Sequence, residues 1–154
     1  MAEPPAYFFD TSALFKRYHR EPGTDAVDAA FAVPAIRIAS DLALIELAST
    51  LARRVRMQQI TVQDFQAAKA AIAQDTQDRG VLCIEGLGEA DKADAARLLE
   101  QYGLTRELRT LDALHLAVMR RLGPEALAAV YCADRRLTAI LEAEGFTVIN
   151  PEIA

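Results

Sequence analysis

Three aromatic residues followed directly by an acid form the segment that most constrains this 154-residue chain. Tyr7, Phe8 and Phe9 make a short apolar run, which indicates a strand buried on both faces of a sheet. A stretch with helical character follows at 11–18. Asp10 therefore lies at the carboxyl end of a first strand, where open α/β sheets place their ligands. An acid at this position also suits a simple cap of the following helix, and the segment alone does not separate the two roles.

Beyond this segment, short apolar runs alternate with longer segments of helical periodicity. Further strands are expected at 36–39, 81–84, 127–132 and 146–149. Further helices are expected at 24–31, 41–57, from 61 onward, 89–102, 111–122 and 135–144. Because strands that alternate with helices build parallel sheets, this order predicts an α/β fold with a central, mostly parallel sheet of about five strands and helices on both faces. The length suits a single domain spanning residues 1–154.

Several helix ends and helix faces are also predicted by the sequence. Thr24 suits the N-cap of the helix at 24–31, and Gly80 suits the position just after the helix that begins near Thr61. Thr61 and Asp64 have the spacing of a capping box. Apolar residues at three- and four-residue steps predict the inner faces of three helices: Leu42, Ile45, Ala48, Ala52 and Val55; Phe65, Ala68, Ile72 and Ala73; Ala93, Ala96 and Leu99.

The composition excludes some classes of protein. Apolar residues make up 52% of the chain and charged residues 25%, which is typical of a folded globular protein and excludes a disordered one. The formal net charge is −5, which argues against broad, non-specific binding of nucleic acid. Arginine clusters such as Arg53-Arg54 leave a local basic face open.

Cysteine usage and hydropathy predict an intracellular protein. Cys83 and Cys132 lie in expected strands and form no C-x-x-C pair, which favours core thiols in a reducing cytosol. The sequence shows no signal peptide and no segment that approaches the ~20 apolar residues needed to span a membrane. We therefore expect a cytoplasmic protein with no membrane partner.

Four acids are candidates for one site. Asp10 and Asp134 each end a strand, so in a parallel sheet both carboxylates emerge at the same edge. Asp112 lies in the first turn of a helix, where an acid also favours the helix dipole. Glu46 lies in an apolar helix on the same stripe as Leu42, so it can face inward, although Glu is also an ordinary solvated helix residue.

Carboxylates that converge need a partner of opposite charge. Two of them ~4 Å apart repel each other by several kcal/mol at an effective dielectric constant near 20, and either protons or a metal ion must relieve this repulsion. Oxygen ligands suit Mg²⁺ or Mn²⁺, and the chain has only two histidines, His19 and His115. Because such a cation polarises phosphoryl oxygens and activates water, the residues point to hydrolysis of a phosphate ester.

Several motifs, taken in order, resemble one family. They are the segments 7–14, 18–23, 46–48, 111–117 and 133–137, with Gly145 and Asn150-Pro151 at the end. The set resembles PIN-domain ribonucleases, especially VapC-type toxins of toxin–antitoxin pairs. The resemblance spans nearly the whole chain and keeps the acids in the order of the family.

The resemblance implies a PIN-like three-layer fold and a metal-dependent endoribonuclease with Mg²⁺ (or Mn²⁺) as cofactor. It implies an acidic site of Asp10, Glu46, Asp112 and Asp134, with Asp10 and Asp112 as principal ligands. The Ser12 hydroxyl would hydrogen-bond to the metal-binding residues and orient them, without binding the cation itself. Implied partners are an RNA substrate, a cognate antitoxin protein and a second copy of the chain in a homodimer.

Three further positions carry expectations. Cys132 stands where the family commonly has Thr, and a thiol is a weak hydrogen-bond donor, which predicts a weaker hold on the region of Asp134. His115 follows Asp112 by one turn; a general base is one interpretation, and a packed or hydrogen-bonded structural residue is the one we favour. Arg53 and Arg54, beyond Glu46, are candidates for contacts with RNA phosphates.

Two other functions fit parts of the sequence. A PIN fold that has lost its chemistry would serve as a protein- or RNA-binding module, but retention of all four acids argues against it. A haloacid-dehalogenase-like phosphatase also begins with an acid after a strand. That chemistry requires a second Asp two residues later, and Ser12 occupies this position.

Overall fold

The computed structural model describes residues 2–77 and 81–154. The strands are β1 (Ala6–Phe9), β2 (Ile36–Ser40), β3 (Cys83–Glu85), β4 (Ala129–Tyr131) and β5 (Val148–Ile149). The helices are α1 (Thr11–Tyr18), α2 (Thr24–Ala32), α3 (Asp41–Arg56), α4 (Val62–Gln77), α5 (Glu89–Tyr102), α6 (Thr110–Leu122) and α7 (Arg135–Ala143). Gly80, expected to follow α4, lies outside the described residues.

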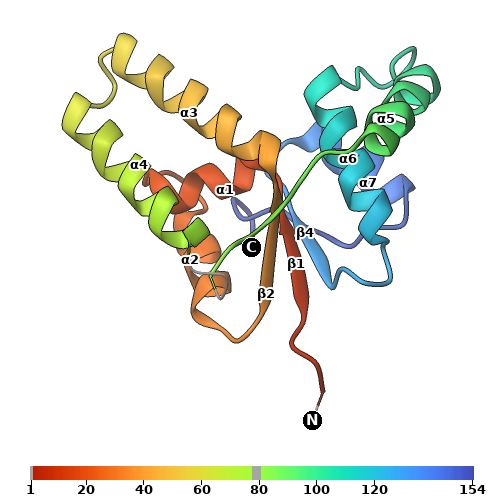
Figure 1. Cartoon of the computed structure of the whole chain (residues 1–154), viewed down its shortest axis with the longest axis horizontal. Helices are drawn as coiled ribbons and strands as arrows, with labels where there is room; N and C mark the ends of the chain where they lie inside the picture. Colours follow the sequence, from red (N-terminus) through yellow and green to blue (C-terminus); the bar gives the residue numbers. More distant parts are fainter. Residues whose placement is uncertain (1, 78–80) are drawn as a thin grey trace.

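The strands pair in the order β3-β2-β1-β4-β5, and every pair is parallel. The aromatic strand β1 is therefore central, as its apolar sequence predicts. Figure 1 shows that the carboxyl ends of β1 and β2 point to the same side of the molecule, between an arm formed by α3 and α4 and a second group formed by α5, α6 and α7. The α/β class and the five-stranded sheet with helices on both faces are confirmed.

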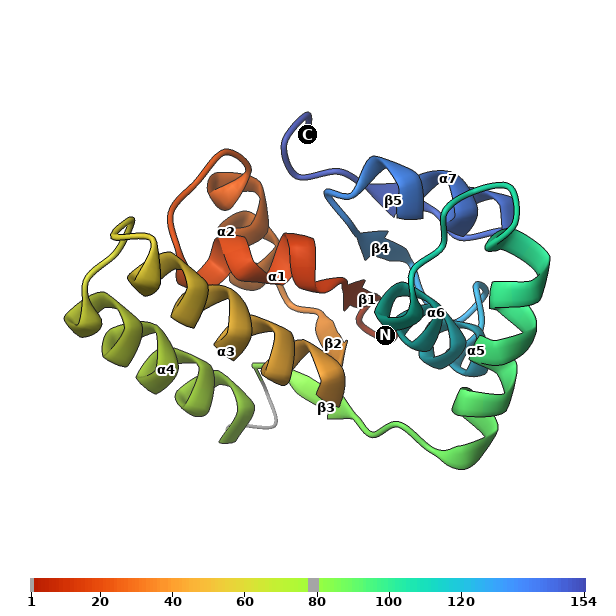
Figure 2. The ribbon, with the colours of Figure 1, turned by 90° about the horizontal axis from the view of Figure 1, so that it is seen from above.

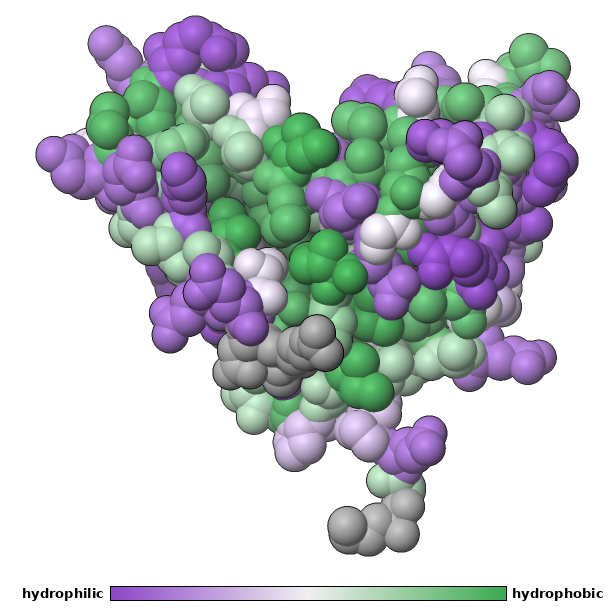
Figure 3. Space-filling model, in the orientation of Figure 1, coloured by the Kyte–Doolittle hydropathy of each residue, from purple (hydrophilic) through white to green (hydrophobic). Residues whose placement is uncertain are grey.

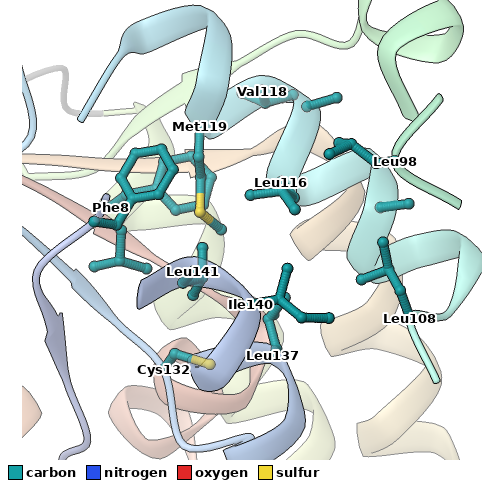
Figure 4. Close-up of a cluster of buried hydrophobic side chains, with 14 of the residues drawn as sticks. Phe8, Leu98, Leu108, Leu116, Val118, Met119, Cys132, Leu137, Ile140 and Leu141 are labelled. Atoms are coloured by element: carbon teal, nitrogen blue, oxygen red, sulfur yellow. The ribbon is translucent and has the colours of Figure 1, made fainter. Parts of the chain in front are cut away.

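Alternation along β1 divides the core into two clusters. Phe8 packs with residues of α5, α6 and α7, including Leu116, Met119 and Leu141 (Figure 4). Phe9 points the other way and packs with residues of α1, α2, α3 and α4, such as Leu47. Figure 2 shows these two groups of helices on opposite sides of the sheet. Both aromatic side chains are fully buried, so β1 fixes the position of everything at its carboxyl end.

The inner faces of two helices differ from the prediction. In α3 the buried residues are Ala43, Leu47 and Leu51, while Ile45 is 69% exposed. In α5 the buried residues are Asp91, Ala95, Leu98 and Tyr102, while Ala93 and Ala96 are exposed. Both helices contain several alanines and leucines, so more than one stripe has helical spacing, and contact with the neighbouring elements selects the stripe one or two residues away. Within the described residues no helix is long and apolar enough to cross a membrane.

The helix starts give a mixed result. Thr61 and Asp64 exchange backbone and side-chain hydrogen bonds, so the capping box is confirmed. Thr24 is the first residue of α2 and not its cap. The capping position belongs to Gly23, whose φ of +94° favours glycine, and where a Cβ would come within 3.0 Å of Lys16 Cδ and of the Pro151 backbone. Thr24 instead donates its hydroxyl to the carbonyl of Lys16.

The inner face of α4 largely matches the prediction. Phe65, Ala68 and Ile72 face the core as predicted, but Ala73 is exposed.

Candidate active site

All four predicted acids line one pocket of about 450 Å³ at the carboxyl edge of the sheet. Asp10 follows β1, Asp134 lies three residues after the end of β4 at Tyr131, Glu46 lies in the second turn of α3, and Asp112 lies in the first turn of α6. The space-filling view shows the molecule hollowed on the side toward which these strands run (Figure 3). Residues separated by up to 124 positions therefore share one concave site, which is what parallel strand order predicts.

Asp10 both caps α1 and faces the pocket. Its N–H donates to the carbonyl of Tyr131, which continues the pairing of β1 with β4. Its Oδ2 accepts hydrogen bonds from the backbone N–H of Ser12 (3.2 Å) and from Ser12 Oγ (2.6 Å). Ser12 Oγ in turn accepts from the N–H of Ala133, so one hydroxyl ties the starts of two helices together. The capping interpretation and the site interpretation thus describe the same carboxylate.

Asp134 repeats this arrangement one strand away. It is the N-cap of α7, and its Oδ1 accepts from the N–H groups of Arg136 (2.8 Å) and Leu137 (3.2 Å). Cys132, expected to hold the region of Asp134 only weakly, has its thiol 3.5 Å from the Asp134 carbonyl oxygen and 3.9 Å from Asp10 Oδ2, and it makes no bond to the Asp134 carboxylate. The helix N-terminus therefore orients Asp134, and Cys132 is a buried core residue (Figure 4). Burial and the nearby Asp10 carboxylate raise the pKa of the thiol to about 12, so it stays protonated.

Glu46 is held by a buried network that sequence analysis only partly foresaw. Its Oε1 accepts from Thr11 Oγ1 (2.8 Å) and is hydrogen-bonded to His115 Nε2. His115 is 1% exposed, and its Nδ1 lies 2.8 Å from Ser40 Oγ. Burial favours the uncharged ring, but the bond to Glu46 outweighs it and raises the pKa of His115. Burial likewise opposes ionisation of Glu46, yet the bonds from His115 and Thr11 lower the pKa of this carboxyl.

Asp112 is the acid with the greatest electrostatic strain. Burial, and after it the negative charges of Asp10 and Asp134, raise its pKa to about 6. The charge of His115 and a backbone hydrogen bond from Arg109 lower the pKa, but by less than burial and the two acids raise it. The three carboxylates of Asp10, Asp112 and Asp134 line the same pocket, and the charges of the other two add to the effect of burial on Asp112.

Three of the acids are each anchored through one oxygen and leave the other available. Within residues 2–77 and 81–154, no hydrogen bond reaches Asp10 Oδ1, Glu46 Oε2 or Asp134 Oδ2. These oxygens and the Asp112 carboxylate form a donor set that suits a hard divalent cation. In the described residues no three His, Cys, Asp or Glu side chains already surround a common point closely enough to hold a metal ion. A cation bound to these carboxylates would relieve their repulsion.

The pocket also contains charged residues that the sequence did not single out. Lys16, in α1, is paired with Glu21 and Glu152, and Arg109 precedes α6. Lys16 follows Ser12 by one helical turn, and this i, i+4 spacing is the sequence signal from which its position on the pocket side of α1 could have been predicted.

The two predicted RNA-contacting arginines lie outside the residues that line the pocket. Arg54 donates to Glu21 Oε2 at 3.3 Å and lies over the Phe15 ring. Both Glu21 and Phe15 line the pocket, so Arg54 lies directly behind the pocket wall. Arg53 is exposed on α3.

Comparison with known proteins gives consistent matches. A family model described as PIN domain matches residues 7–142. The chain is 32% identical over 148 residues to a protein named Ribonuclease VapC46 from Mycobacterium tuberculosis, covering 95% of this chain and 98% of that one.

Two solved structures are similar in fold. The crystal structure of VapC20 from Mycobacterium tuberculosis, a Sarcin-Ricin loop cleaving toxin, superposes with a TM-score of 0.66 at 24% identity over 87% of this chain and 94% of that one. A toxin–antitoxin complex from Klebsiella pneumoniae superposes with a TM-score of 0.60 at 16% identity, over 94% of this chain and 97% of that one.

Proposed function

The chain belongs to the PIN domain family, and on that basis we propose that it is an Mg²⁺- or Mn²⁺-dependent endoribonuclease, the toxin of a type II toxin–antitoxin pair. The observation that carries this proposal is the convergence of four carboxylates on one pocket at the carboxyl edge of the sheet. The relative with 32% identity across nearly both whole chains is named a ribonuclease, which supports the same reaction.

Each acid has a role in this proposal. Asp10 and Asp112 would hold the cation directly, and Glu46 and Asp134 would complete the site directly or through water. A divalent cation bound there supplies a polarised phosphoryl oxygen and a bound water of lowered pKa. Ser12 fixes Asp10, and Thr11 with His115 fixes Glu46, so the oxygens that face the pocket are oriented before substrate arrives.

The partners follow from the same proposal. The RNA backbone would enter the pocket, with Arg53 and Arg54 contacting phosphates on the α3 side. A cognate antitoxin would bind the protein, as the toxin–antitoxin complex of similar fold suggests. We also propose that the protein forms a homodimer and acts in the cytoplasm.

RNA cleavage by the purified protein tests the proposal. We expect cleavage with Mg²⁺ or Mn²⁺, loss of cleavage on chelation, and loss in Asp10→Asn, since Asn retains the helix cap but not the charge. Asp25→Asn removes an exposed acid of the same type and should cleave like the parent. Undiminished cleavage by Asp10→Asn would refute the acid assignment. A parent that binds RNA but cleaves none in either metal would favour the binding module.

A further inference from the structure

Lys16 is a buried cation in a pocket of acids. The residue is 2% exposed, and its Nζ donates at 2.8 Å to both Glu21 Oε1 and Glu152 Oε1. Burial disfavours the ammonium, but the two carboxylates outweigh this and raise the pKa of Lys16, so it stays charged. We refer to Lys16, Glu21, Arg54 and Glu152 as the Lys16 cluster.

The two carboxylates of the cluster are held differently. Glu21 is 21% exposed and is also bonded by Arg54, so it belongs to the fixed part of the cluster. Glu152 comes from the segment after β5 and is 45% exposed. Pro151 is buried beside Gly23, and the N–H of Glu152 donates to Asn150 Oδ1, so the backbone there is fixed while the Glu152 side chain reaches Lys16 from solvent.

The charges of the cluster cancel only while Glu152 is in place. Lys16 and Arg54 contribute two positive charges, and Glu21 and Glu152 contribute two negative charges. Without Glu152 the cluster carries one net positive charge next to the acids. Glu152 is the exposed partner of the buried Lys16, so an anion from solvent can replace its carboxylate at this position.

We propose that Lys16 binds a phosphate of the RNA and that the Glu152 carboxylate occupies this phosphate site until RNA displaces it. This inference rests on the proposed function. A phosphate oxygen accepts the same charge-assisted N–H bond that Glu152 accepts. An anionic backbone entering a pocket with six carboxylates requires a cation there, and Lys16 and Arg109 are the basic residues that line it in the described chain.

Glu152→Gln tests this proposal, with Glu107→Gln as the matched control. Glu107 lies two residues before Arg109, is exposed, and pairs with Arg136 and not with Lys16. Binding of a fluorescein-labelled single-stranded RNA is measured by anisotropy in an Asp112→Asn background that blocks turnover. We expect Glu152→Gln to lower Kd by about two- to fivefold, because the site no longer has an internal competitor. In the active protein KM should fall by a similar factor with kcat unchanged, and Glu107→Gln should change neither.

A second substitution shows whether Glu152 acts through Lys16. In a Lys16→Gln background, which should weaken RNA binding, Glu152→Gln is expected to give no further change in Kd. Equal tightening by Glu152→Gln and Glu107→Gln, or an unchanged benefit without Lys16, would overturn the proposal in favour of general electrostatics. Should Lys16→Gln fail to fold by circular dichroism, the comparison of Glu152→Gln with Glu107→Gln decides alone. A parent that cleaves RNA while Glu152→Gln binds RNA no better than the parent removes this inference and leaves the proposed function standing.

Discussion

The two ends of the pocket treat negative charge in opposite ways. At the acidic end Asp10, Asp112 and Asp134 line the same part of the pocket, and no basic side chain in the described part of the chain is hydrogen-bonded to them; burial and the charges of the other two acids raise the pKa of Asp112 to about 6. At the other end Glu21 and Glu152 enclose the ammonium of Lys16 at 2.8 Å. The first arrangement is electrostatically unfavourable for the protein alone, and the second is balanced within it.

The difference in charge balance indicates which end of the pocket serves binding and which end supports the fold. Acids in a pocket whose pKa values are raised by burial and by neighbouring like charges are typical of functional sites. A balanced ion pair supports the fold and, where one partner is half-exposed, also offers an exchangeable site. The acidic end is therefore the place for a cation, and the Lys16 cluster is the place for an anion.

The largest expected effect comes from Asp112→Asn. We predict a loss of RNA cleavage of at least about a hundredfold, since a ligand of the cation disappears. In the metal-free protein the same change should raise Tm by about 2–4 °C, corresponding to about 1 kcal/mol after allowance for solvent around this half-buried side chain. Cleavage assays and thermal denaturation check both signs. A variant that loses both activity and stability would indicate that Asp112 has a structural role, and the two ends of the pocket would then not differ in how they treat negative charge.

The next effect is the response to divalent cations at two pH values. A carboxyl whose pKa rises on folding destabilises the protein as it ionises, so the contribution of Asp112 to stability falls between about pH 4 and pH 6 and stays low above that. Mn²⁺ binds the ionised form and should raise Tm at pH 7.5, by about 2.7 kcal/mol of stability at a hundredfold excess over Kd. The shift should be smaller at pH 5 and should be largely lost in Asp112→Asn. Equal shifts at both pH values in the parent would contradict the assignment.

Removal of the cation at the other end should have the opposite sign. Lys16→Met leaves Glu152 without its partner and Glu21 with Arg54 alone, and we predict a destabilisation of about 2 kcal/mol, reduced from the buried-pair value because both carboxylates are partly exposed. Tm should then fall by about 4–8 °C. Lys92→Met, at an exposed i, i+3 pair with Glu89, is the control and should change Tm little. A parent-like Tm in Lys16→Met would mean that the cluster is not a folding element.

The smallest predicted effect concerns the anchoring of Glu46. Thr11→Val removes one of the two hydrogen bonds to Oε1 and leaves His115 in place, so we expect kcat to fall by about fivefold, equivalent to one hydrogen bond, with KM unchanged. Thr50→Val, in the same pocket, changes a hydroxyl that makes no bond to Glu46 and should retain the parent kcat. If both variants lose activity equally, the effect is one of pocket polarity and not of anchoring.

Much of the fold and the acidic end could be predicted from the sequence for a physical reason. In a parallel sheet the carboxyl ends of all strands meet at one edge, so the aromatic run before Asp10 and the apolar run before Asp134 already imply neighbouring carboxylates. The Lys16–Glu152 pair joins residues 136 positions apart, and Glu152 lies in an irregular segment with no periodic pattern. Nothing local in the sequence specifies such a contact.

Helix faces show the same limit. Ile45 belongs to an apolar stripe of correct spacing, yet α3 turns Leu47 to the core and leaves Ile45 exposed. The spacing of alanines and leucines permits several stripes, and the positions of α1, α4 and β2 around α3 select one. Glu46 points into the pocket because Thr11 and His115, from α1 and α6, bond to it.

The central claim is that the acidic end holds a divalent cation, and anomalous diffraction from crystals soaked in Mn²⁺ tests it most directly. We predict an anomalous peak in the pocket within bonding distance of Asp10 Oδ1 and the Asp112 carboxylate, and its absence in Asp112→Asn crystals. Parent crystals that bind Mn²⁺ elsewhere and show no peak between these two side chains would contradict the account.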